Sequence, residues 1–448
     1  MRGGWERAAR STFRRFSPLV GREPFSDAMK YSVITFGCRV NQADSLAIEG
    51  DLRARGAAAA PPEEAELVVV NTCSVTASAD QAARQTIRRI ARSNPLVRIV
   101  VTGCYATRRP EDVAALPNVV RVIENDSKDS LVADVAEDVH LSTASRFGDG
   151  DGPCGRTLEP GVAGRTALTL RVQTGCEERC SYCIIPQTRG PSRSRSIVAV
   201  LRDVEYAVAA GYKEIAITGV HLGSFGRDLQ DGSSLSGLLR ALAAVSSDVL
   251  FRVSSLEPMD CTHEIVDIVA SSPRLAPHFH LPLQNGSNDV LRMMQRPYSV
   301  GYYVRLVERI AASMPHAAIG SDIIVGFPGE TAAHFAETLG VLHDLPLAYL
   351  HVFPYSDRPG TAASTRRPKV DGADIRDRAR RVRDIGAQMA ARFRRSQIGR
   401  LSRALTVDDG QSAVTPNYLK LRLDVKRARN EWIDVRLDDE HHGHVVTL

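Results

Sequence analysis

Short apolar runs alternate with helical patterns along most of the chain, and this alternation strongly restricts its fold. The first three runs lie at residues 31–36, 67–70 and 97–101, with helical patterns near 43–55 and 78–93. Strand–helix–strand alternation implies a parallel sheet covered by helices. The sequence therefore predicts an N-terminal α/β domain over residues 30–140.

Six more strand-like runs follow, and helical segments separate most of them. They lie at residues 167–172, 214–218, 249–253, 278–281, 319–325 and 349–353. Six such units predict a parallel sheet bent into an open (βα)6 barrel over residues 166–396, with its active site where the strands end. The whole chain is therefore expected to be of the α/β class.

The remaining segments differ in character. Residues 1–29 form a separate extension, which fits either an organellar transit segment or a start assigned too far upstream. Residues 141–165 are turn-rich and read as a linker. Residues 397–448 contain alternating runs at 418–425 and 431–437, which predict a small β-barrel-like domain.

Composition excludes several classes of protein. Hydrophobic residues make up 43% and charged residues 24%, which is typical of a globular chain. No window of about 18 consecutive apolar residues exists, so neither a membrane span nor a membrane partner is expected. We expect a cytoplasmic protein in a reducing compartment, where disulfides are the less favoured use of its eight cysteines.

Six of the cysteines fall into two sets. Cys38, Cys73 and Cys104 each follow a predicted strand, and ligands bind beyond the carboxyl ends of such strands. Cys176, Cys180 and Cys183 form a tight cluster in one loop. Three thiolates can hold three irons of a 4Fe–4S cluster and leave the fourth iron open. Zinc is the alternative, although a structural zinc site needs four ligands.

These motifs resemble a known family. The stretch Cys176-Glu-Glu-Arg-Cys180-Ser-Tyr-Cys183 is similar to the cluster motif of radical S-adenosylmethionine (SAM) enzymes. Together with Gly37-Cys38-Arg-Val-Asn-Gln, Asn71-Thr-Cys73-Ser-Val-Thr and Gly103-Cys104-Tyr, it resembles the methylthiotransferase family. The resemblance extends from about residue 30 to about residue 425.

The resemblance implies a radical mechanism with SAM and two 4Fe–4S clusters. Cys176, Cys180 and Cys183 would hold the cluster that cleaves SAM, and the resulting 5′-deoxyadenosyl radical would remove hydrogen from C2 of an adenine. Cys38, Cys73 and Cys104 would hold an auxiliary cluster that carries the sulfur. An electron donor such as a flavodoxin or ferredoxin and a sulfur source are implied as partners.

The motifs look most like the branch that modifies N6-threonylcarbamoyladenosine beside the tRNA anticodon. The same chemistry on isopentenyladenosine of tRNA, or on an aspartate of a ribosomal protein, stays open. From other classes, a non-catalytic iron–sulfur electron carrier and a zinc protein that binds RNA also stay open.

Several further residues are candidates for the site. Near strand ends or the cysteine loop, the candidates for binding SAM are Tyr182, Gly219, Val220, Glu257 and Asp322. His221, His280 and Gln284 are candidate lining residues, and Arg189, Arg193 and Arg195 are candidates for phosphate or for holding the cluster loop. Cys154 and Cys261 are not expected to be ligands.

The C-terminal part carries the expected RNA contacts. Residues 366–400 contain twelve Lys or Arg against four Asp, and 371–396 reads as one basic helix, either a polyanion surface or a solvated face with Asp–Arg pairs. The resemblance implies that residues 397–448 are a TRAM module. The candidate contacts with the tRNA anticodon arm are Arg380, Arg381, Arg394, Arg395 and Lys420. The module is short and acidic at Asp408 and Asp409, so a degenerate module stays open, with RNA affinity placed mostly on the helix.

Overall fold

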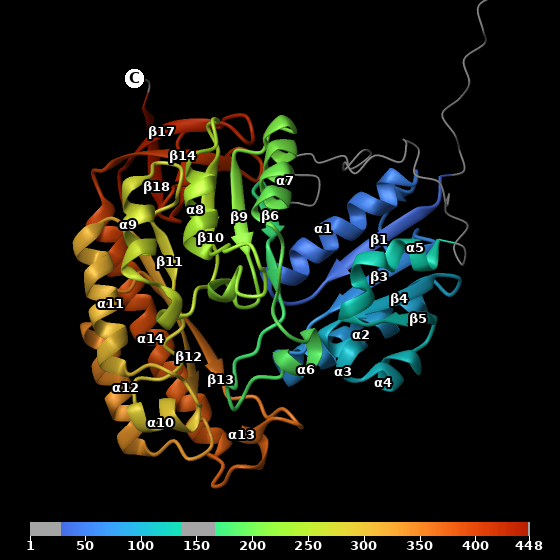
Figure 1. Ribbon diagram of the computed structural model, residues 1–448, viewed down its shortest axis with the longest axis horizontal. Helices are drawn as coiled ribbons and strands as arrows, with labels where there is room; N and C mark the ends of the chain where they lie inside the picture. The colour runs from blue at the N-terminus through green and yellow to red at the C-terminus, as the bar shows by residue number, and fades with distance from the viewer. Residues whose placement is uncertain (1–27, 137–165, 447–448) are drawn as a thin grey trace, which may run out of the picture.

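The computed structural model describes residues 28–136 and 166–446, which form an N-terminal sheet, an open barrel and a small closed barrel (Figure 1). The α/β prediction with three such parts is confirmed. Most of the predicted extension, the linker 141–165 and Cys154 lie outside the described residues.

The N-terminal part is a parallel five-stranded sheet in the order β2-β1-β3-β4-β5. Its central strand β3 is buried along its whole length, as expected for an apolar run covered on both faces. Helices α1 and α5 cover one face, and α2, α3 and α4 cover the other. The strands are β1 (Lys30–Thr35), β2 (Ala58–Ala59), β3 (Leu67–Thr72), β4 (Arg98–Gly103) and β5 (Val119–Ile123). The helices are α1 (Arg39–Ala54), α2 (Ala77–Ser93), α3 (Cys104–Arg108), α4 (Pro110–Ala114), η1 (Asn125–Ser130) and α5 (Leu131–Val135).

The central part is the predicted six-stranded open barrel. Two parallel sheets, β10-β9-β6 and β11-β12-β13, are joined by bridges from Phe251 to Leu275 and from Ser255 to His280. The strands are β6 (Leu168–Arg171), β9 (Glu214–Thr218), β10 (Leu250–Val253), β11 (His278–His280), β12 (Ala318–Val325) and β13 (Tyr349–Pro354).

Six longer helices cover the outside of this barrel. Most begin at a Ser or Thr whose hydroxyl accepts a hydrogen bond from the first turn, as at Ser196, Thr262 and Thr331. They are α7 (Ile197–Ala209), α8 (Leu235–Ala243), α9 (His263–Ser271), α11 (Val300–Ser313), α12 (Ala332–Asp344) and α14 (Gly372–Gln397). The short elements are β7 (Gln173–Thr174), α6 (Ile185–Arg189), β8 (Arg193–Ser194), η2 (Leu222–Ser224), η3 (Pro258–Asp260), α10 (Asn288–Met293) and α13 (Ala362–Thr365).

Strand alternation gives the barrel an apolar outer face and a polar inner face. On β12, Ile319 and Ile323 belong to the core beneath the helices, whereas Gly320 and Asp322 point the other way. A Cβ atom on Gly320 would lie 2.0 Å from the Tyr349 ring, so glycine lets this ring lie across the strand. The inner face therefore has room for bulky polar side chains.

The C-terminal part is a closed barrel in the order β14-β15-β16-β18-β17. Its strands are β14 (Leu401–Val407), β15 (Ser412–Val414), β16 (Lys420–Leu423), β17 (Trp432–Leu437) and β18 (His442–Val446). The predicted strand 418–425 is shorter, because Tyr418 has a positive φ of 69° and ends a turn. Although the module is short, its barrel is complete, so the degenerate alternative is wrong for the fold.

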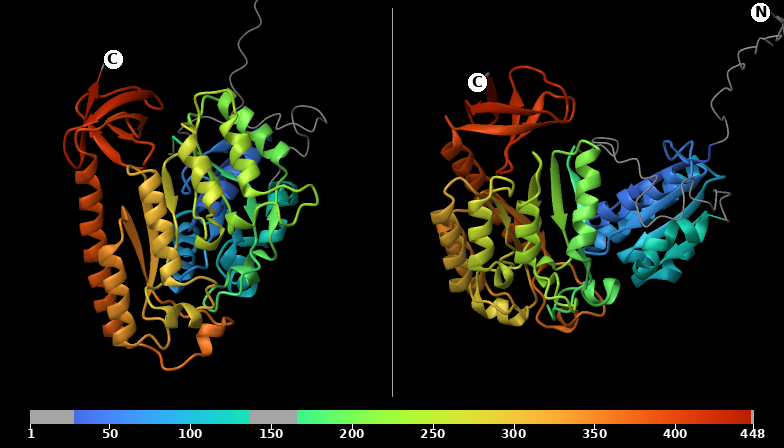
Figure 2. Two further views of the ribbon diagram at one scale, coloured as in Figure 1. Left: turned by 60° about the vertical axis from the view of Figure 1, so that its left-hand side comes forward. Right: turned by 45° about the horizontal axis from the view of Figure 1, so that its top comes forward.

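This C-terminal barrel sits where the strands of the open barrel begin, opposite the loops that follow them (Figure 2). Arg252 donates to the Pro416 carbonyl at 2.7 Å, and Arg403 pairs with Asp248 just before β10 at 2.9 Å. None of the described helices is both long and apolar enough to cross a membrane.

A buried carboxylate joins the N-terminal part to the open barrel. Asp44 of α1 accepts hydrogen bonds from Lys128 at 3.0 Å, Arg171 at 2.6 Å and Arg189 at 3.0 Å. Burial alone would raise the pKa of Asp44, but the three cations hold it well below its usual range. Two of these cations, Arg171 and Arg189, belong to the barrel part.

Asp44→Asn should destabilise the protein by about 3–5 kcal/mol, because it leaves buried cations without their counter-charge. Thermal unfolding of the full-length protein measures this. The matched control is Asp129→Asn, which also contacts Arg171 but has a side chain 78% exposed, and should change stability by about 0–1 kcal/mol. Equal stability of the two variants would contradict a large contribution of Asp44 to the free energy of unfolding.

Candidate active site

The three N-terminal cysteines meet at one edge of the sheet. Cys38 lies between β1 and α1, Cys73 directly follows β3, and Cys104 opens α3 directly after β4. A Cβ atom on Gly37, which has a φ of 94°, would lie 2.5 Å from Cys73 Sγ, so these two loops touch. Cys73 and Cys104 are buried and Cys38 is exposed. We call these residues the N-terminal triad; its accessible side is that of Cys38.

The two buried thiols of this triad have different electrostatic surroundings. Burial raises the pKa of Cys73 to about 12. Burial would also raise the pKa of Cys104, but Arg189 and Lys128 outweigh it and lower that pKa. The Cys104 sulfur is therefore the better prepared to act as a thiolate.

Cys176, Cys180 and Cys183, the barrel triad, lie in the loop between β7 and α6. The Cys176 amide donates to the Gly190 carbonyl at 3.0 Å, and the Cys183 amide donates to the Cys180 carbonyl at 3.1 Å, so the loop is folded on itself. Arg296 donates to Cys180 Sγ at 3.0 Å. Burial raises the pKa of Cys183 to about 12.

His221 lies beside the barrel triad. Its Nδ1 is 3.8 Å from Cys176 Sγ, and its Nε2 is 2.7 Å from Asp260. Burial alone would lower the pKa of His221, but hydrogen bonding with Asp260 and Cys176 raises it to about 10. The imidazolium form therefore places positive charge next to a sulfur atom.

The spacing of the sulfur atoms bears on which metal group fits. Zn–S bonds of about 2.3 Å in a tetrahedral site place sulfur atoms roughly 3.8 Å apart. Among the described residues, one set of three metal-ligating side chains has all its ligand atoms within 4.8 Å of one another, and it contains no cysteine. Both triads are wider than a single zinc ion requires, whereas soft sulfur ligands spread over a larger volume fit an iron–sulfur cluster.

Arg189 connects the two triads. It lies six residues after Cys183, at the end of α6, and donates to Asn41 at 2.5 Å and to Thr174 at 3.2 Å. Asn125 donates to the Thr188 carbonyl at 2.7 Å and lies 3.7 Å from Cys104 Sγ. The helix that follows the barrel triad is thus packed against the N-terminal triad.

The predicted SAM-binding residues lie in different surroundings. Tyr182 packs against Val290, Met294 and Phe327 in an apolar cluster. Gly219 and Val220 follow β9, and a Cβ atom on Gly219 would lie 2.8 Å from Gln173 Oε1. Their contacts with SAM stay predictions.

Glu257 and Asp322 are each engaged by basic side chains. Glu257 forms an ion pair with Arg296, and burial raises the pKa of Glu257. Asp322 contacts His280 and His351 on the inner face of the barrel, 2.9 Å and 3.2 Å away. Burial would raise the pKa of Asp322, but these two histidines lower it to about 2.

The remaining candidates have structural contacts. Gln284 has a positive φ of 68°, and its backbone bridges to Ile323. Arg193 pairs with Asp126, and Arg195 pairs with Asp203. Cys261 is buried in the apolar core and belongs to neither triad.

Sequence patterns did not reveal several residues of the site. Arg296 lies 116 residues from Cys180, and Asp44 lies 84 residues from Lys128. No local spacing connects partners so far apart. His351 offered a weak signal, since it alternates with Tyr349 on a strand beside Asp322.

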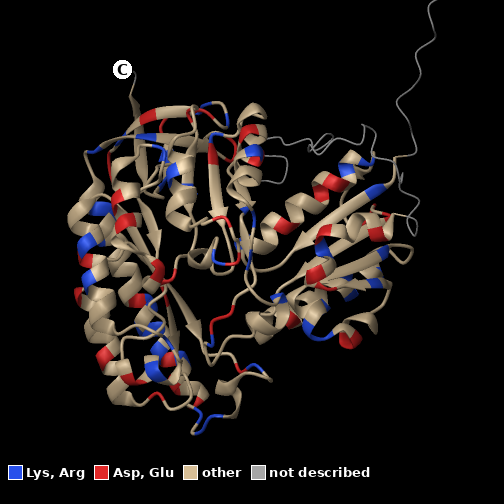
Figure 3. Ribbon diagram, viewed as in Figure 1, with Lys and Arg blue, Asp and Glu red and all other residues tan. Residues whose placement is uncertain are grey.

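The predicted RNA contacts are all occupied within the protein. Arg380 and Arg381 bind Asp377, Arg394 binds the Glu440 carbonyl, Arg395 binds the Glu440 carboxylate and Lys420 binds Asp408. Lys/Arg and Asp/Glu are mixed over the ribbon in Figure 3. The Asp–Arg pairs of a solvated face are therefore present, and RNA binding by these residues stays a prediction.

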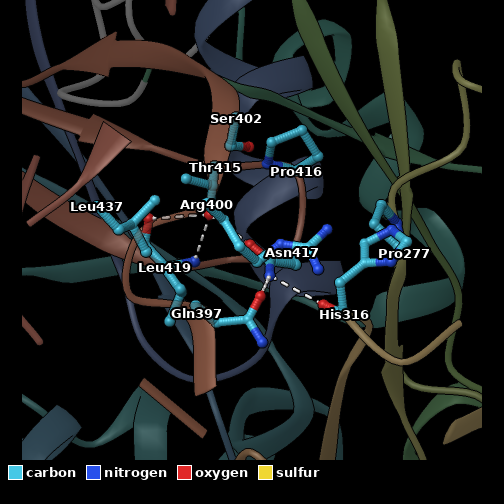
Figure 4. Close-up of a pocket in the computed structure, with 10 residues that line it drawn as sticks. All are labelled: Pro277, His316, Gln397, Arg400, Ser402, Thr415, Pro416, Asn417, Leu419 and Leu437. Carbon is cyan, nitrogen blue, oxygen red and sulfur yellow. Dashed lines mark hydrogen bonds between the residues drawn. The ribbon is translucent and has the colours of Figure 1, made fainter. Parts of the chain in front are cut away.

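A cavity of about 180 Å³ lies between the C-terminal barrel and the open barrel. Asn417 donates to the His316 carbonyl at 2.9 Å and to Gln397 at 3.1 Å (Figure 4). Neither cysteine triad contributes to its lining, which includes Arg400 and Leu437. The hydrogen bonds of Asn417 hold the loop that carries Tyr418 against the open barrel.

Comparison with known families matches both halves of the site. Residues 30–124 match "Uncharacterized protein family UPF0004", and residues 170–342 match the radical SAM superfamily. A "Threonylcarbamoyladenosine tRNA methylthiotransferase MtaB" from Aquifex aeolicus is 34% identical over 88% of this chain and 96% of its own length.

One more relative and one solved structure extend the comparison. A "tRNA-2-methylthio-N(6)-dimethylallyladenosine synthase" from Parafrankia sp. is 36% identical over 83% of this chain and 76% of its own length. The radical SAM methyltransferase TsrM from Kitasatospora setae, solved with cobalamin and a [4Fe-4S] cluster, has a TM-score of 0.53 at 16% identity over 75% of this chain and 77% of its own. The last comparison supports the fold alone.

Arg296→Gln should lower stability by about 3–5 kcal/mol, because Glu257 is left partly buried without its cation. The double variant Arg296→Gln/Glu257→Gln should recover part of this loss, which thermal unfolding would detect as non-additivity. Arg292→Gln, an exposed arginine paired with Asp289, is the control and should have little effect. Additive losses in the double variant would show that the ion pair contributes no coupling energy to stability.

Proposed function

The chain belongs to the radical SAM methylthiotransferase family, and we propose that it transfers a methylthio group to C2 of N6-threonylcarbamoyladenosine beside the tRNA anticodon. Its named relatives are tRNA methylthiotransferases, and the enzyme is a transferase of that kind. What we propose beyond the family is the identity of the adenosine that it modifies.

The names of the relatives favour the choice of substrate, since several relatives at 32–34% identity over most of this chain are threonylcarbamoyladenosine enzymes. The polar inner face, with Asp322 between His280 and His351, also suits a polar substituent better than an isopentenyl group.

We propose that the barrel triad holds the SAM-cleaving cluster and the N-terminal triad holds the auxiliary cluster. Bound there, the clusters and SAM would supply the radical chemistry and the sulfur atom. The chain's own residues prepare both places: Arg296 donates to Cys180, His221 lies beside Cys176, and Arg189 stabilises the Cys104 thiolate. Cations beside anionic sulfur offset its charge in a buried site.

The partners follow from this chemistry. We propose the tRNA anticodon arm as the substrate, a flavodoxin or ferredoxin as the electron donor, and a separate sulfur source. A loop base leaves its stack at low cost, so the adenine can enter the barrel from the anticodon loop.

The two-cluster proposal predicts about eight irons per chain, since each cluster contains four. Replacing Cys176, Cys180 and Cys183 with Ala should leave about four irons, and so should replacing Cys38, Cys73 and Cys104. Iron and acid-labile sulfide are measured on anaerobically purified protein. Cys261→Ala is the control and should keep the wild-type content. Stoichiometric zinc in place of iron, or loss of all iron from either triple variant, would contradict two independent clusters.

The substrate is tested by mass spectrometry of nucleosides from total tRNA of a strain without this gene. We expect 2-methylthio-threonylcarbamoyladenosine to disappear and its unthiolated precursor to accumulate. Complementation should restore the product with wild type and Cys261→Ala, but not with Cys176→Ala or Cys73→Ala. Loss of the isopentenyl product instead would assign the other substrate, and an unchanged nucleoside profile would contradict action on tRNA.

A further inference from the structure

We propose that Arg39, Asp322 and His351 form the site that binds the anionic, hydrogen-bonding substituent on N6 of the target adenine. This inference rests on the proposed function and assigns residues to its substrate specificity. It concerns the inner face of the barrel together with Arg39, which directly follows Cys38.

The inner face carries a continuous chain of hydrogen bonds. His278 Nε2 lies 2.8 Å from the Tyr349 hydroxyl, which lies 3.1 Å from His280 Nδ1. His280 Nε2 lies 2.9 Å from Asp322 Oδ1, and His351 Nδ1 lies 3.2 Å from the same oxygen. These rings also lie against one another, with centroids 5.2 Å apart for His280 and His351. The chain of contacts fixes each side chain in one orientation.

The end of this chain is open to a ligand. The His351 side chain is 57% exposed and that of Asp322 is 21% exposed, although both face the inside of the barrel. Both histidines bind Oδ1 of Asp322, and within the described residues neither Asp322 Oδ2 nor His351 Nε2 has a partner. A carboxylate oxygen and an imidazole nitrogen are thus available together. Because His351 Nδ1 donates to Asp322, Nε2 of the neutral ring accepts, so both free atoms suit the hydroxyl and N–H groups of a ligand.

Arg39 adds a positive charge next to this surface. It directly follows Cys38, its Nη2 donates to the Tyr418 hydroxyl at 3.0 Å, and no carboxylate pairs with it in the described part of the chain. The Tyr418 ring lies 4.9 Å from the His278 ring, which continues into the hydrogen-bonded chain. The guanidinium therefore lies between the N-terminal triad and the polar inner face. A carboxylate is the group that such a donor binds best.

These donors and acceptors match one class of substituent. A threonylcarbamoyl group offers a carboxylate, a hydroxyl and urea N–H groups, whereas an isopentenyl group offers none of them. An apolar substituent would desolvate Arg39 without giving it a carboxylate, and Asp322 Oδ2 without giving it a donor, and sites built for hydrogen bonds reject such analogues strongly.

Two histidines and a carboxylate also form a ligand set that suits a divalent metal. All three ligand atoms lie within 4.8 Å of one another. Both nitrogen-to-oxygen distances are ordinary hydrogen-bond lengths, so the group is complete without an ion. We therefore argue for substrate binding and let the experiment decide against a metal.

The test measures binding of short anticodon stem-loops to the full-length, cluster-loaded enzyme by anaerobic fluorescence anisotropy. Four loops are compared: unmodified adenine, threonylcarbamoyladenosine, its neutral carboxamide analogue and isopentenyladenosine. Wild type should bind the threonylcarbamoyl loop about tenfold more tightly than the carboxamide or the unmodified loop. Iron content and the visible spectrum confirm that each variant retains its clusters.

Each variant tests one part of the proposed site. Arg39→Gln should abolish the difference between the carboxylate and the carboxamide loops. Asp322→Asn and His351→Leu should each weaken binding of the threonylcarbamoyl loop about tenfold and leave binding of the unmodified loop unchanged. The matched controls are His343→Leu, an exposed histidine beside Asp344, and Arg309→Gln, which pairs with Asp267 on the surface. Both controls should bind every loop as wild type does.

The outcomes separate this inference from the proposed function. If wild type prefers the threonylcarbamoyl loop but all three variants keep that preference, the inference is wrong and the function stands. If wild type prefers isopentenyladenosine or does not distinguish the loops, the proposed substrate fails and the inference fails with it. If a chelator abolishes the preference and added Zn²⁺ or Mn²⁺ restores it with clusters intact, a metal replaces the direct contacts.

Discussion

The buried contact of Asp44 with Lys128, Arg171 and Arg189 determines how the two cysteine triads face each other. Lys128 comes from the N-terminal part, whereas the two arginines come from the barrel. A carboxylate with no exposed surface needs several donors, and three cations need that carboxylate. Because Arg189 also contacts Cys104, one network holds the interface and lowers the pKa of a buried thiol. If Cys104 holds a cluster as we propose, cluster chemistry and domain arrangement are coupled.

The inner face of the barrel also depends on a few residues. Alternation along β12 and β13 places apolar side chains under the helices and leaves Asp322, Tyr349 and His351 facing inward. Gly320 supplies the space that the Tyr349 ring occupies. Buried polar side chains would destabilise an ordinary apolar core. Their presence on this face therefore indicates that the face binds a ligand rather than packs as a core.

Local patterns in the sequence were sufficient to predict the six strands of the open barrel, three strands of the N-terminal sheet, the helices α1, α2 and α14, and both cysteine sets, but not β5 or β14. Strand ends follow from apolar runs that stop at Gly, Asn or Thr, as at Gly37 and Asn71, and parallel strands bring their ends together. The side chains around the sulfur atoms could not be predicted in this way. Arg296, Lys128 and Asp260 reach their partners only through the tertiary fold, and one sequence contains no signal for such distant pairs. Nor could the closure of the C-terminal barrel be predicted from strands as short as β15 and β16.

The position of the C-terminal barrel limits how tRNA can bind. This barrel sits where the strands begin, while the cysteine loops follow the strand ends (Figure 2). Tyr418, at the tip of its loop, nevertheless reaches Arg39 beside Cys38. Four of the eight arginines of α14 are engaged in ion pairs, which leaves less free charge than the sequence predicts. A tRNA that delivers one adenine to the inner face, as we propose, must therefore find part of its binding energy at the mouth of the barrel, where the base itself would be held.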